Sequence, residues 1–183
     1  ICLLYFLSVA FSNNLSLKKI NIPQSVQKIE EDAFGWCHNL SEFTGKFASE
    51  DGRLLIVDGN IVAVAAHNLT NITIPRSVRR IGKTVFSNMQ TLENVVMSNS
   101  VISIGDQAFA LNEKLKNITI SDSVMELGFG IVMGCGNLET INGKYASSDK
   151  RCLIKDGVLN SFAPYGLSYY EIPSSVTAIG DYA

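Results

Sequence analysis

The sequence has few charged residues and no excess of positive charge. Asp, Glu, Lys and Arg make up 17% of its 183 residues, and the formal net charge is -2. This balance gives no basic surface for nucleic acid, so we predict no nucleic-acid partner. No apolar run reaches the roughly 18 residues that a transmembrane helix needs. We therefore predict no membrane span in this sequence.

The sequence also lacks the patterns that usually mark catalytic and metal sites. Its four cysteines contain no C-x-x-C pair, and there is neither a G-x-S-x-G elbow nor a glycine-rich phosphate loop. The two histidines, His38 and His67, are interpreted as surface residues rather than as part of a Cys-His dyad. We predict no catalytic residues, no metal and no cofactor, and hence a protein that is not an enzyme.

A frame of apolar residues recurs along the whole chain. In residues 69–88 it reads L-T-N-I-T-I-P-R-S-V-R-R-I-G-K-T-V-F-S-N. The Leu that opens the frame returns every 23 residues, except for two steps of 29 residues. A constant period of this size is the signature of a solenoid. The opening residues are Leu17, Leu40, Leu69, Leu92, Leu115, Leu138 and Leu167.

Each repeat is expected to form a short half-buried strand and then a corner. In Leu17–Pro23, Ile20 and Ile22 alternate with polar residues and should point inward, while Pro23 ends the strand. The Ser-Val-x-x-Ile-Gly segment forms the corner, and an inward Phe follows it. The sequence thus predicts a β-rich solenoid of stacked 23-residue repeats, with a parallel sheet on one face and few short helical turns.

At one position, three residues after the inward Phe, Asn alternates with Cys, and a buried Asn or thiol there can satisfy backbone groups of the turn. Cys37 and Cys135 at this position would lie four rungs apart, about 19 Å at about 4.8 Å per strand. This distance is too long for a disulfide. Cys152 matches Leu54 and is expected to be buried. The residues at the shared position are Asn14, Cys37, Met89, Asn112 and Cys135.

The two longer steps contain an insertion that occurs twice, 98 residues apart. Residues 45–66 and 143–164 replace the corner, and each contains an Asp-Gly pair between apolar runs, at Asp58-Gly59 and Asp156-Gly157. Asp-Gly in this setting predicts a β-hairpin. We expect two small β-meanders that project from the same side of the solenoid. The recurring acidic residues are interpreted as turn-forming residues rather than as ligands or a catalytic couple.

The apolar stretch Ile1–Phe11 has two interpretations. Its length fits the apolar region of a signal peptide, although no basic segment precedes it. In the register of the next repeat, Leu3, Phe6 and Ala10-Phe11 fall on the Val, Ile and Ala-Phe positions, which favours a partial repeat. Because Ser174–Ala183 also stops within a repeat, we expect residues 1–183 to form one solenoid that is a fragment of a longer array.

The outward positions of the predicted strands are the candidate binding residues. Stacked Asn71, Asn94 and Asn117 would form a ladder on a polar concave surface that offers amides and hydroxyls to a protein or a glycan. Such stacking also stabilises a sheet, so a structural role is the alternative. An aromatic group near the second insertion is a comparable candidate, with packing of the meander as its alternative: Phe162, Tyr165, Tyr169 and Tyr170. The candidate ligand-binding residues are Lys19, Asn21, Asn71, Thr73, Asn94, Asn117, Thr119, Tyr169 and Glu171.

Together these features resemble the BspA-like leucine-rich-repeat family, also called the Treponema pallidum type. The repeat of that family reads roughly L-x-x-I-x-I-P-x-x-V-x-x-I-G-x-x-A-F-x-x-C, and it is visible in Leu17–Cys37, Leu69–Phe86 and Leu167–Ala183. The inserted G-K-[FY]-A-S-x-D-x-R-x-L-I-x-D-G segment is similar to one found in surface proteins of the family. Departures such as Met97-Ser98 in place of Ile-Pro concern the corners and not the fold.

The resemblance implies a secreted or surface-anchored bacterial protein and a non-enzymatic binding module. Its expected partner is a host matrix protein, a cell-surface protein or a glycan, and its expected location is extracellular or at the cell surface. Two alternatives are a structural spacer and an accessory module of a polysaccharide-degrading enzyme. An exposed apolar or aromatic patch would favour adhesion. A surface that carries only the asparagine ladder would favour the spacer. A pair of carboxylates that face each other across a cleft would favour the enzyme module.

Overall fold

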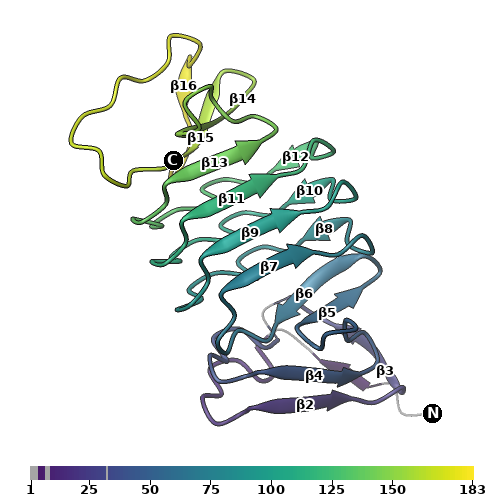
Figure 1. Ribbon diagram of the computed structural model, residues 1–183. Coiled ribbons are helices and arrows are strands. Elements are labelled where there is room, and N and C mark those ends of the chain that lie inside the picture. The colour runs from purple at the N-terminus through teal and green to yellow at the C-terminus, as the bar shows by residue number, and fades with distance from the viewer. Residues whose placement is uncertain (1–3, 7–8, 32) are drawn as a thin grey trace.

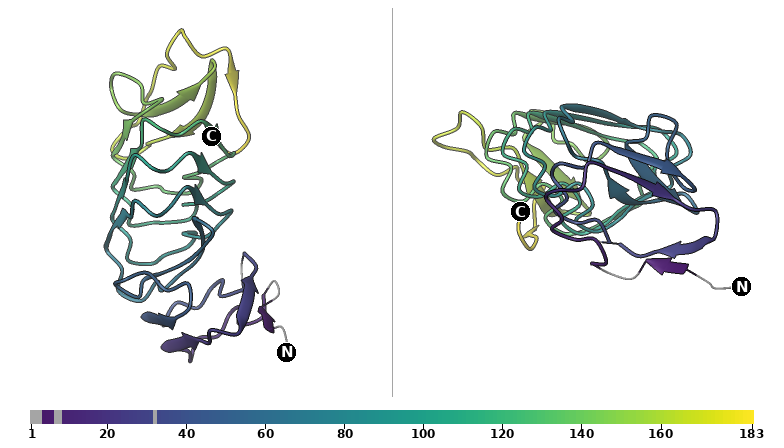
Figure 2. Two further views of the ribbon diagram at one scale, coloured as in Figure 1. Left: turned by 90° about the vertical axis from the view of Figure 1, so that its right-hand side faces the viewer. Right: turned by 90° about the horizontal axis from the view of Figure 1, so that it is seen from below.

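Alternation of apolar and polar residues folds each repeat into one rung of a solenoid. The computed structural model, which describes residues 4–6, 9–31 and 33–183, shows the rungs stacked along one axis, with residues 4–6 and the C-terminus at opposite ends of the stack (Figures 1 and 2). In each regular rung a four-residue strand is followed by a corner, a short second strand and a run of turns. The solenoid predicted from the 23-residue period is confirmed.

The first strands of the rungs pair in parallel and form what we call the long-strand sheet. Equivalent residues of successive repeats stand side by side, so that Asn71 pairs with Asn94, and Asn94 with Asn117. Its four-stranded part consists of β7 (Asn71–Ile74), β9 (Asn94–Met97), β11 (Asn117–Ile120) and β13 (Thr140–Gly143). A separate two-stranded part consists of β2 (Lys19–Ile22) and β4 (Glu42–Gly45).

The second strands form a parallel corner sheet of very short strands. A glycine follows several of these strands because successive rungs approach closely there: a β-carbon at Gly128 would lie 2.3 Å from the amide nitrogen of Asp106. The corner strands are β8 (Arg80–Ile81), β10 (Ser103–Ile104) and β12 (Glu126–Leu127). At the N-terminal end, β1 (Leu4–Phe6) pairs in parallel with β3 (Val26–Ile29).

The N-terminal stretch forms part of a rung, as the repeat register predicts. The backbone of Phe6 pairs with that of Ile29, and the Phe11 ring stacks on Phe34 with ring centroids 5.2 Å apart. The amide of Phe11 donates to the carbonyl of Ala33 at 2.8 Å. The interpretation as a partial repeat is confirmed for these residues, while the predicted place of Leu3 lies outside the described residues.

Both insertions contain the predicted antiparallel hairpin. Asp58 and Gly59 have φ values of 50° and 77°, the left-handed pair of a two-residue hairpin turn. Isolated bridges from Ala48 to Leu55 and from Ala146 to Leu153 extend each hairpin into a small meander. The hairpin strands are β5 (Leu54–Val57) with β6 (Asn60–Val64), and β14 (Cys152–Lys155) with β15 (Val158–Phe162).

The prediction that the hairpins project from the solenoid is wrong. β6 pairs in parallel with β8, and β15 pairs in parallel with β16 (Ala178–Ile179), so each hairpin occupies the place of a corner strand inside the stack. Both faces of β6 are buried: Ile61 belongs to one apolar cluster with Phe86, and Val62 belongs to another with Phe34. The hairpin therefore divides the core in two, and no pairing joins β4 to β7 (Figure 1).

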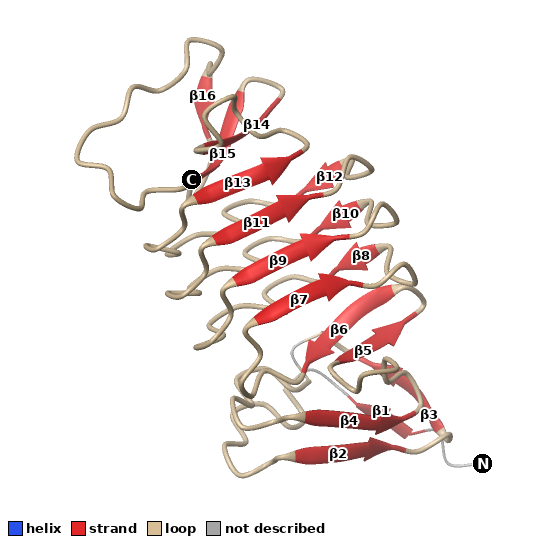
Figure 3. Ribbon diagram, viewed as in Figure 1, coloured by secondary structure: helices blue, strands red, loops and turns tan. Residues whose placement is uncertain are grey.

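The return segments of the rungs are turns. The few short helical turns expected here are not formed, and the described residues contain no helix (Figure 3). Two positions in several return segments have left-handed backbone, for example Thr84 and Asn88 with φ of 54°, and again Gln107 and Leu111. A left-handed residue every few positions prevents a right-handed helix from propagating.

Candidate functional site

The long-strand sheet turns alternate side chains outward, as the sequence predicts. On β7, Asn71 and Thr73 are exposed, while Ile72 and Ile74 are buried. The same alternation on the neighbouring strands leaves five further candidate residues exposed or half-buried on the outer face: Lys19, Asn21, Asn94, Asn117 and Thr119.

The predicted asparagine ladder is present. The Asn94 amide nitrogen donates to Asn71 Oδ1 at 2.7 Å, and the Asn117 amide nitrogen donates to Asn94 Oδ1 at 2.9 Å. The hydroxyl of Thr140 continues the chain by donating to Asn117 Oδ1 at 2.6 Å. Each amide oxygen of the ladder is thus occupied by the next rung. This network stabilises the sheet and leaves the ladder fewer groups for a ligand.

A second outward column lies two residues beyond the asparagines on each strand. Its polar groups are less occupied than those of the ladder. It consists of Thr73, Val96 and Thr119 on β7, β9 and β11. Within the described part of the chain the two threonine hydroxyls have no hydrogen-bond partner, and Val96 is 44% exposed. We call these three residues the threonine column. Its hydroxyls and the valine methyls are available for contact with a ligand.

The candidate residues do not form one continuous surface. Lys19 and Asn21 lie on the separate β2–β4 part, where Lys19 Nζ is 2.5 Å from Glu42 and the Thr44 hydroxyl donates to Asn21 Oδ1 at 3.1 Å. The first inserted hairpin separates this part from β7. The prediction of a projecting hairpin does not account for this separation, which arises because β6 lies inside the stack.

Tyr169 and Glu171 are not on the sheet, and their predicted place on an outward strand is wrong. Residues 168–173 have no strand structure. β7, the equivalent strand after the first insertion, pairs only with the following rung β9, and residues 168–173 have no such rung beside them. Tyr169 is 79% exposed, and Glu171 lines a cavity of about 430 Å³ with Asp149 and Tyr170.

The aromatic group near the second insertion is divided between packing and exposure. Phe162 and Tyr170 pack together with ring centroids 4.7 Å apart, and the Tyr170 hydroxyl donates to Asp149 Oδ2 at 2.8 Å. Burial raises the pKa of Tyr170 well above its ordinary value. For these two rings, packing of the meander is confirmed. Tyr165 and Tyr169 remain exposed.

The ionisable groups of the sheet edge form an exposed pair. Lys116 Nζ lies 2.8 Å from Glu93 Oε2, and this hydrogen bond lowers the pKa of Glu93 and raises the pKa of Lys116. Exposed pairs of this kind contribute little to stability. The two charges cancel, so the face of the sheet between β7 and β13 stays close to neutral.

The recurring acidic residues form turns. Asp51 Oδ1 accepts hydrogen bonds from the Ser49 hydroxyl at 2.6 Å and the Arg53 amide at 3.0 Å, and Asp149 makes the same pair of bonds in the second insertion. The turn-forming interpretation is confirmed for both residues. Among the residues that the structure describes, no three His, Cys, Asp or Glu side chains are placed to hold a metal ion.

The cysteines of the described residues are buried thiols. Cys37 Sγ donates to the carbonyl of Phe11 at 3.1 Å, and Cys135 Sγ donates to that of Phe109 at 3.2 Å. Burial raises the pKa of both thiols, that of Cys135 to about 12, and it also raises the pKa of Cys152. A buried, protonated thiol is a poor nucleophile. Cys37 and Cys135 thus satisfy backbone carbonyls, whereas the Cys152 thiol lies 3.2 Å from the Tyr170 hydroxyl.

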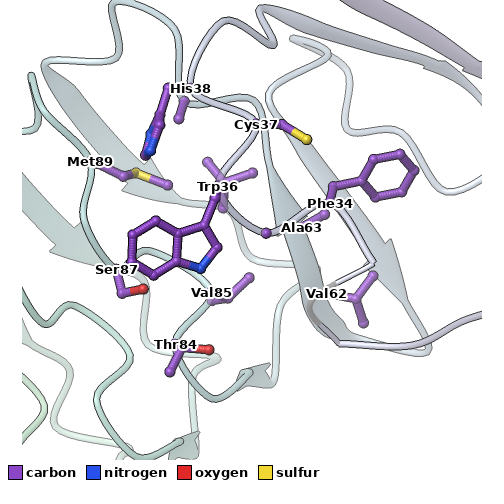
Figure 4. A pocket seen from close by; sticks show the side chains of 13 residues that line it. Phe34, Trp36, Cys37, His38, Val62, Ala63, Thr84, Val85, Ser87 and Met89 are labelled. Carbon is purple, nitrogen blue, oxygen red and sulfur yellow. The ribbon is translucent and has the colours of Figure 1, made fainter. Parts of the chain in front are cut away.

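One hollow that sequence reasoning missed lies on the turn side of the first insertion. It is a cavity of about 50 Å³ between the turns of two rungs, with β6 as its floor, and we call it the turn slot. Figure 4 shows the Trp36 indole in the slot, with His38, Met89, Ser87 and Thr84 around it. Trp36 is 54% exposed and makes an edge-to-face contact with His38, with ring centroids 6.1 Å apart.

Two irregularities in the repeat could have indicated the turn slot. Asn112 and Cys135 donate to the Phe carbonyl of the preceding rung, but Met89 at the same position cannot donate. Met is tolerated there because the hairpin has moved the preceding rung away. Trp36 likewise occupies a left-handed position that holds Asn13 and Asn88 in other rungs.

Comparison with known proteins places this architecture in a family. The profile of the BspA type leucine rich repeat region matches residues 5–49 and 63–183 in six copies. The chain belongs to this family. The unmatched residues 50–62 fall in the first insertion and include β5.

Solved structures of bacterial leucine-rich-repeat proteins are similar to this chain. One is a leucine-rich repeat protein from Eubacterium ventriosum, with 25% identity and a TM-score of 0.58 over 70% of this chain and 36% of that one. Another is a leucine rich cell surface protein from Faecalibacterium prausnitzii, with 28% identity and a TM-score of 0.56 over 67% of this chain and 35% of that one. The pneumococcal vaccine antigen PcpA, at 16% identity and a TM-score of 0.56 over 89% of this chain and 51% of that one, shares the fold.

The chain therefore spans about a third of the length of the first two of these proteins. A search of curated proteins finds no match. Within the described residues, no helix has the length and apolar character needed to cross a bilayer.

Proposed function

We propose that this chain is a non-enzymatic binding module of an extracellular or cell-surface protein, and that it adheres to a host matrix protein or another cell. The observation that carries the proposal is the outer face of β7, β9 and β11, which presents polar, nearly uncharged side chains in register. Membership of the BspA-type family supports a protein-interaction role. The cell-surface description of the Faecalibacterium prausnitzii protein supports the location.

Within this face, the threonine column is the better contact surface. The amide oxygens of the asparagine ladder accept hydrogen bonds from neighbouring rungs, whereas the hydroxyls of Thr73 and Thr119 have no partner among the described residues. Val96 between them adds an exposed apolar group. A column of two hydroxyls around a valine suits the polar, partly apolar surface of a protein, or a glycan.

Binding to immobilised fibronectin, fibrinogen and a glycan panel tests the proposal. The test variant is the double change Thr73→Lys and Thr119→Lys, which places two charges on the column and leaves the ladder intact. The matched control is Gln24→Lys with Gln90→Lys, two exposed positions outside the strands of the sheet that change the net charge equally. We expect saturable binding that the test variant loses and the control keeps. Binding that survives in both variants would contradict a site on this face.

A structural spacer is the second candidate, and the ladder is the observation that favours it. Three side-chain hydrogen bonds link four strands across the face and stiffen the stack without any ligand. A spacer would bind none of the immobilised proteins or glycans. The same binding experiment therefore separates the two candidates.

A further inference from the structure

The turn side of regular rungs is joined by backbone hydrogen bonds between equivalent positions. The Asn88 amide donates to the Ala110 carbonyl at 2.9 Å, and the Leu111 amide donates to the Met133 carbonyl at 2.7 Å. A second bond of the series runs from the Phe86 amide to the Ala108 carbonyl at 2.9 Å. Each return segment thus offers donors to the next rung and acceptors to the previous one.

At the first insertion this series is interrupted. Trp36 stands at the donor position of Asn88 and Leu111, and Ser87 stands at the acceptor position of Ala110. The Trp36 amide and the carbonyls of Val85 and Ser87 have no backbone partner among the described residues. The two edges of the turn slot therefore carry an unused donor on one side and two unused acceptors on the other, because the hairpin below does not reach this surface.

The walls of the turn slot are mostly apolar. Its floor is formed by Val62, Ala63 and Val64, which are all at least 94% buried, and Met89 closes one side. No Asp, Glu, Lys or Arg lines the slot. A charged ligand would find no carboxylate, Lys or Arg side chain here, whereas a peptide backbone with a small apolar side chain would find both hydrogen bonds and apolar contact.

Trp36 narrows the slot and is held there at a conformational cost. Its φ of 64° is left-handed, which is rare for a bulky side chain and persists only where the surrounding structure enforces it. At the second insertion Gly134 and Gly136 replace Trp36 and His38, and the equivalent cavity measures about 260 Å³ against about 50 Å³. The aromatic pair is therefore a feature of the first slot and is not required by the fold.

We propose that the turn slot binds an extended segment of a partner polypeptide, whose backbone replaces the missing return segment. The partner's carbonyl accepts from the Trp36 amide, and its own amides donate to Ser87 and Val85, with the Trp36 indole covering the segment. This inference takes from the proposed function only the idea that the partner is a protein. The turn slot is a different surface from the long-strand sheet. Polypeptide backbone is favoured because it alternates donors and acceptors at the spacing of the neighbouring rungs.

The single tryptophan of the sequence reports on the slot directly. The ligand for the test is an acetylated and amidated peptide with the sequence of residues 105–112 carrying Phe109→Ala, since the floor of the slot leaves no room for the ring. In the regular stack, residues 109 and 111 of this segment supply the two amides and residue 110 supplies the carbonyl. The control peptide carries N-methyl groups on residues 109 and 111 and so lacks both donors.

We expect the first peptide to shift the Trp36 emission saturably, with a dissociation constant below about 1 mM, and the N-methylated peptide to bind at least about tenfold more weakly. The Thr73→Lys, Thr119→Lys variant should bind the peptide as the unmodified chain does. Equal affinity of the two peptides, no emission change, or a change produced by free sugars but not by peptide would each overturn the inference. Adhesion through the sheet would be untouched by such a failure, so the two proposals fail separately.

Discussion

The two inserted hairpins share their bracing contacts and differ in what they cover. In the first, Arg53 Nη1 donates to the carbonyls of Ala65 at 3.2 Å and His67 at 3.0 Å; in the second, Arg151 Nη1 donates to the equivalent carbonyls at the same two distances. The Ser-Asp turn that precedes each arginine is also repeated. These contacts hold the hairpin to its own turn and depend on no neighbouring rung.

The faces that contact neighbouring rungs have diverged. Val62 and Ala63 of the first hairpin pack in an apolar cluster, whereas Asn160 and Ser161 at the same positions are buried and polar. The Asn160 amide donates to the Gly128 carbonyl at 2.8 Å, and the Ser161 hydroxyl donates to Asn160 Oδ1 at 2.9 Å. The arginine and Ser-Asp hydrogen bonds, which we call the brace, are therefore common to both hairpins. The residues of each hairpin that face a neighbouring rung differ with that rung.

Truncation of a shared apolar residue should have the largest effect and should be equal in the two copies. Leu55 and Leu153 are both fully buried against the rungs that precede their hairpins. We expect Leu55→Ala and Leu153→Ala each to lower the free energy of unfolding by about 3–5 kcal/mol, through lost burial and the cavity left behind. Urea unfolding measures this, and a near-zero effect in one copy would show that its hairpin does not pack into the stack.

Removal of the arginine brace should have the second largest effect on stability. Arg53→Met and Arg151→Met keep the aliphatic stem but leave two carbonyls without their charged donor, so we expect each to cost about 2–3 kcal/mol. The control is Arg76→Met, because Arg76 is an exposed corner residue. A loss in the control as large as in the two test variants would mean that the charge itself, and not the brace, is responsible.

Exchange of the diverged faces should have a smaller effect. Asn160→Val copies the first hairpin into the second and leaves the Gly128 carbonyl and the Ser161 hydroxyl without their partner, at an expected cost of about 1–3 kcal/mol. Adding Ser161→Ala should recover part of this loss, because one of the two unsatisfied groups is then removed. If Asn160→Val is neutral in urea unfolding, the polar face is not adapted to its rung.

The smallest expected effect is a pH dependence at the buried cysteines. The pKa of Cys135 is raised from 9.0 to about 12, so its contribution to stability is complete below about pH 9 and is lost as the pH rises toward 12. Cys135→Ser keeps a hydroxyl donor and removes this titration. We expect the unmodified chain to lose more stability between pH 8 and pH 10 than this variant does. Identical pH profiles would contradict a buried, protonated thiol.

The equivalent Cys37 allows the same comparison in the first copy. Its pKa is also raised by burial, and its thiol makes the same bond to a Phe carbonyl. Both cysteines should resist iodoacetamide at pH 8 in the folded chain and react once urea unfolds it.

Much of this fold follows from the period of the sequence. The spacing of the Leu residues, the alternation in Asn71–Ile74 and the Asp58-Gly59 pair are local signals, and each predicts a local structure that is present. The asparagine ladder follows from the same register.

The predictions that are wrong concern features that depend on contacts between segments far apart in the chain. The run Ile61–Val64 is apolar at every position, which is the pattern of a strand buried on both faces, whereas the Asp58-Gly59 pair alone predicts a projecting hairpin. That error hid both the interruption of the long-strand sheet and the turn slot. The repeat pattern predicts a strand at Tyr169 by equivalence with β7, but β7 is paired with β9, whereas residues 168–173 are not paired with any described strand.

Native-state hydrogen exchange tests most directly whether the hairpins are internal layers of the solenoid. We predict that the amides of Ile61–Val64 exchange as slowly as those of Val95 and Ile118 in the long-strand sheet, since all lie in the same buried stack. Exchange of the Ile61–Val64 amides at the rate of a corner turn such as Ser98–Ser100 would contradict this prediction. The hairpin would then be a surface appendage, and the divided core and the turn slot would both be lost.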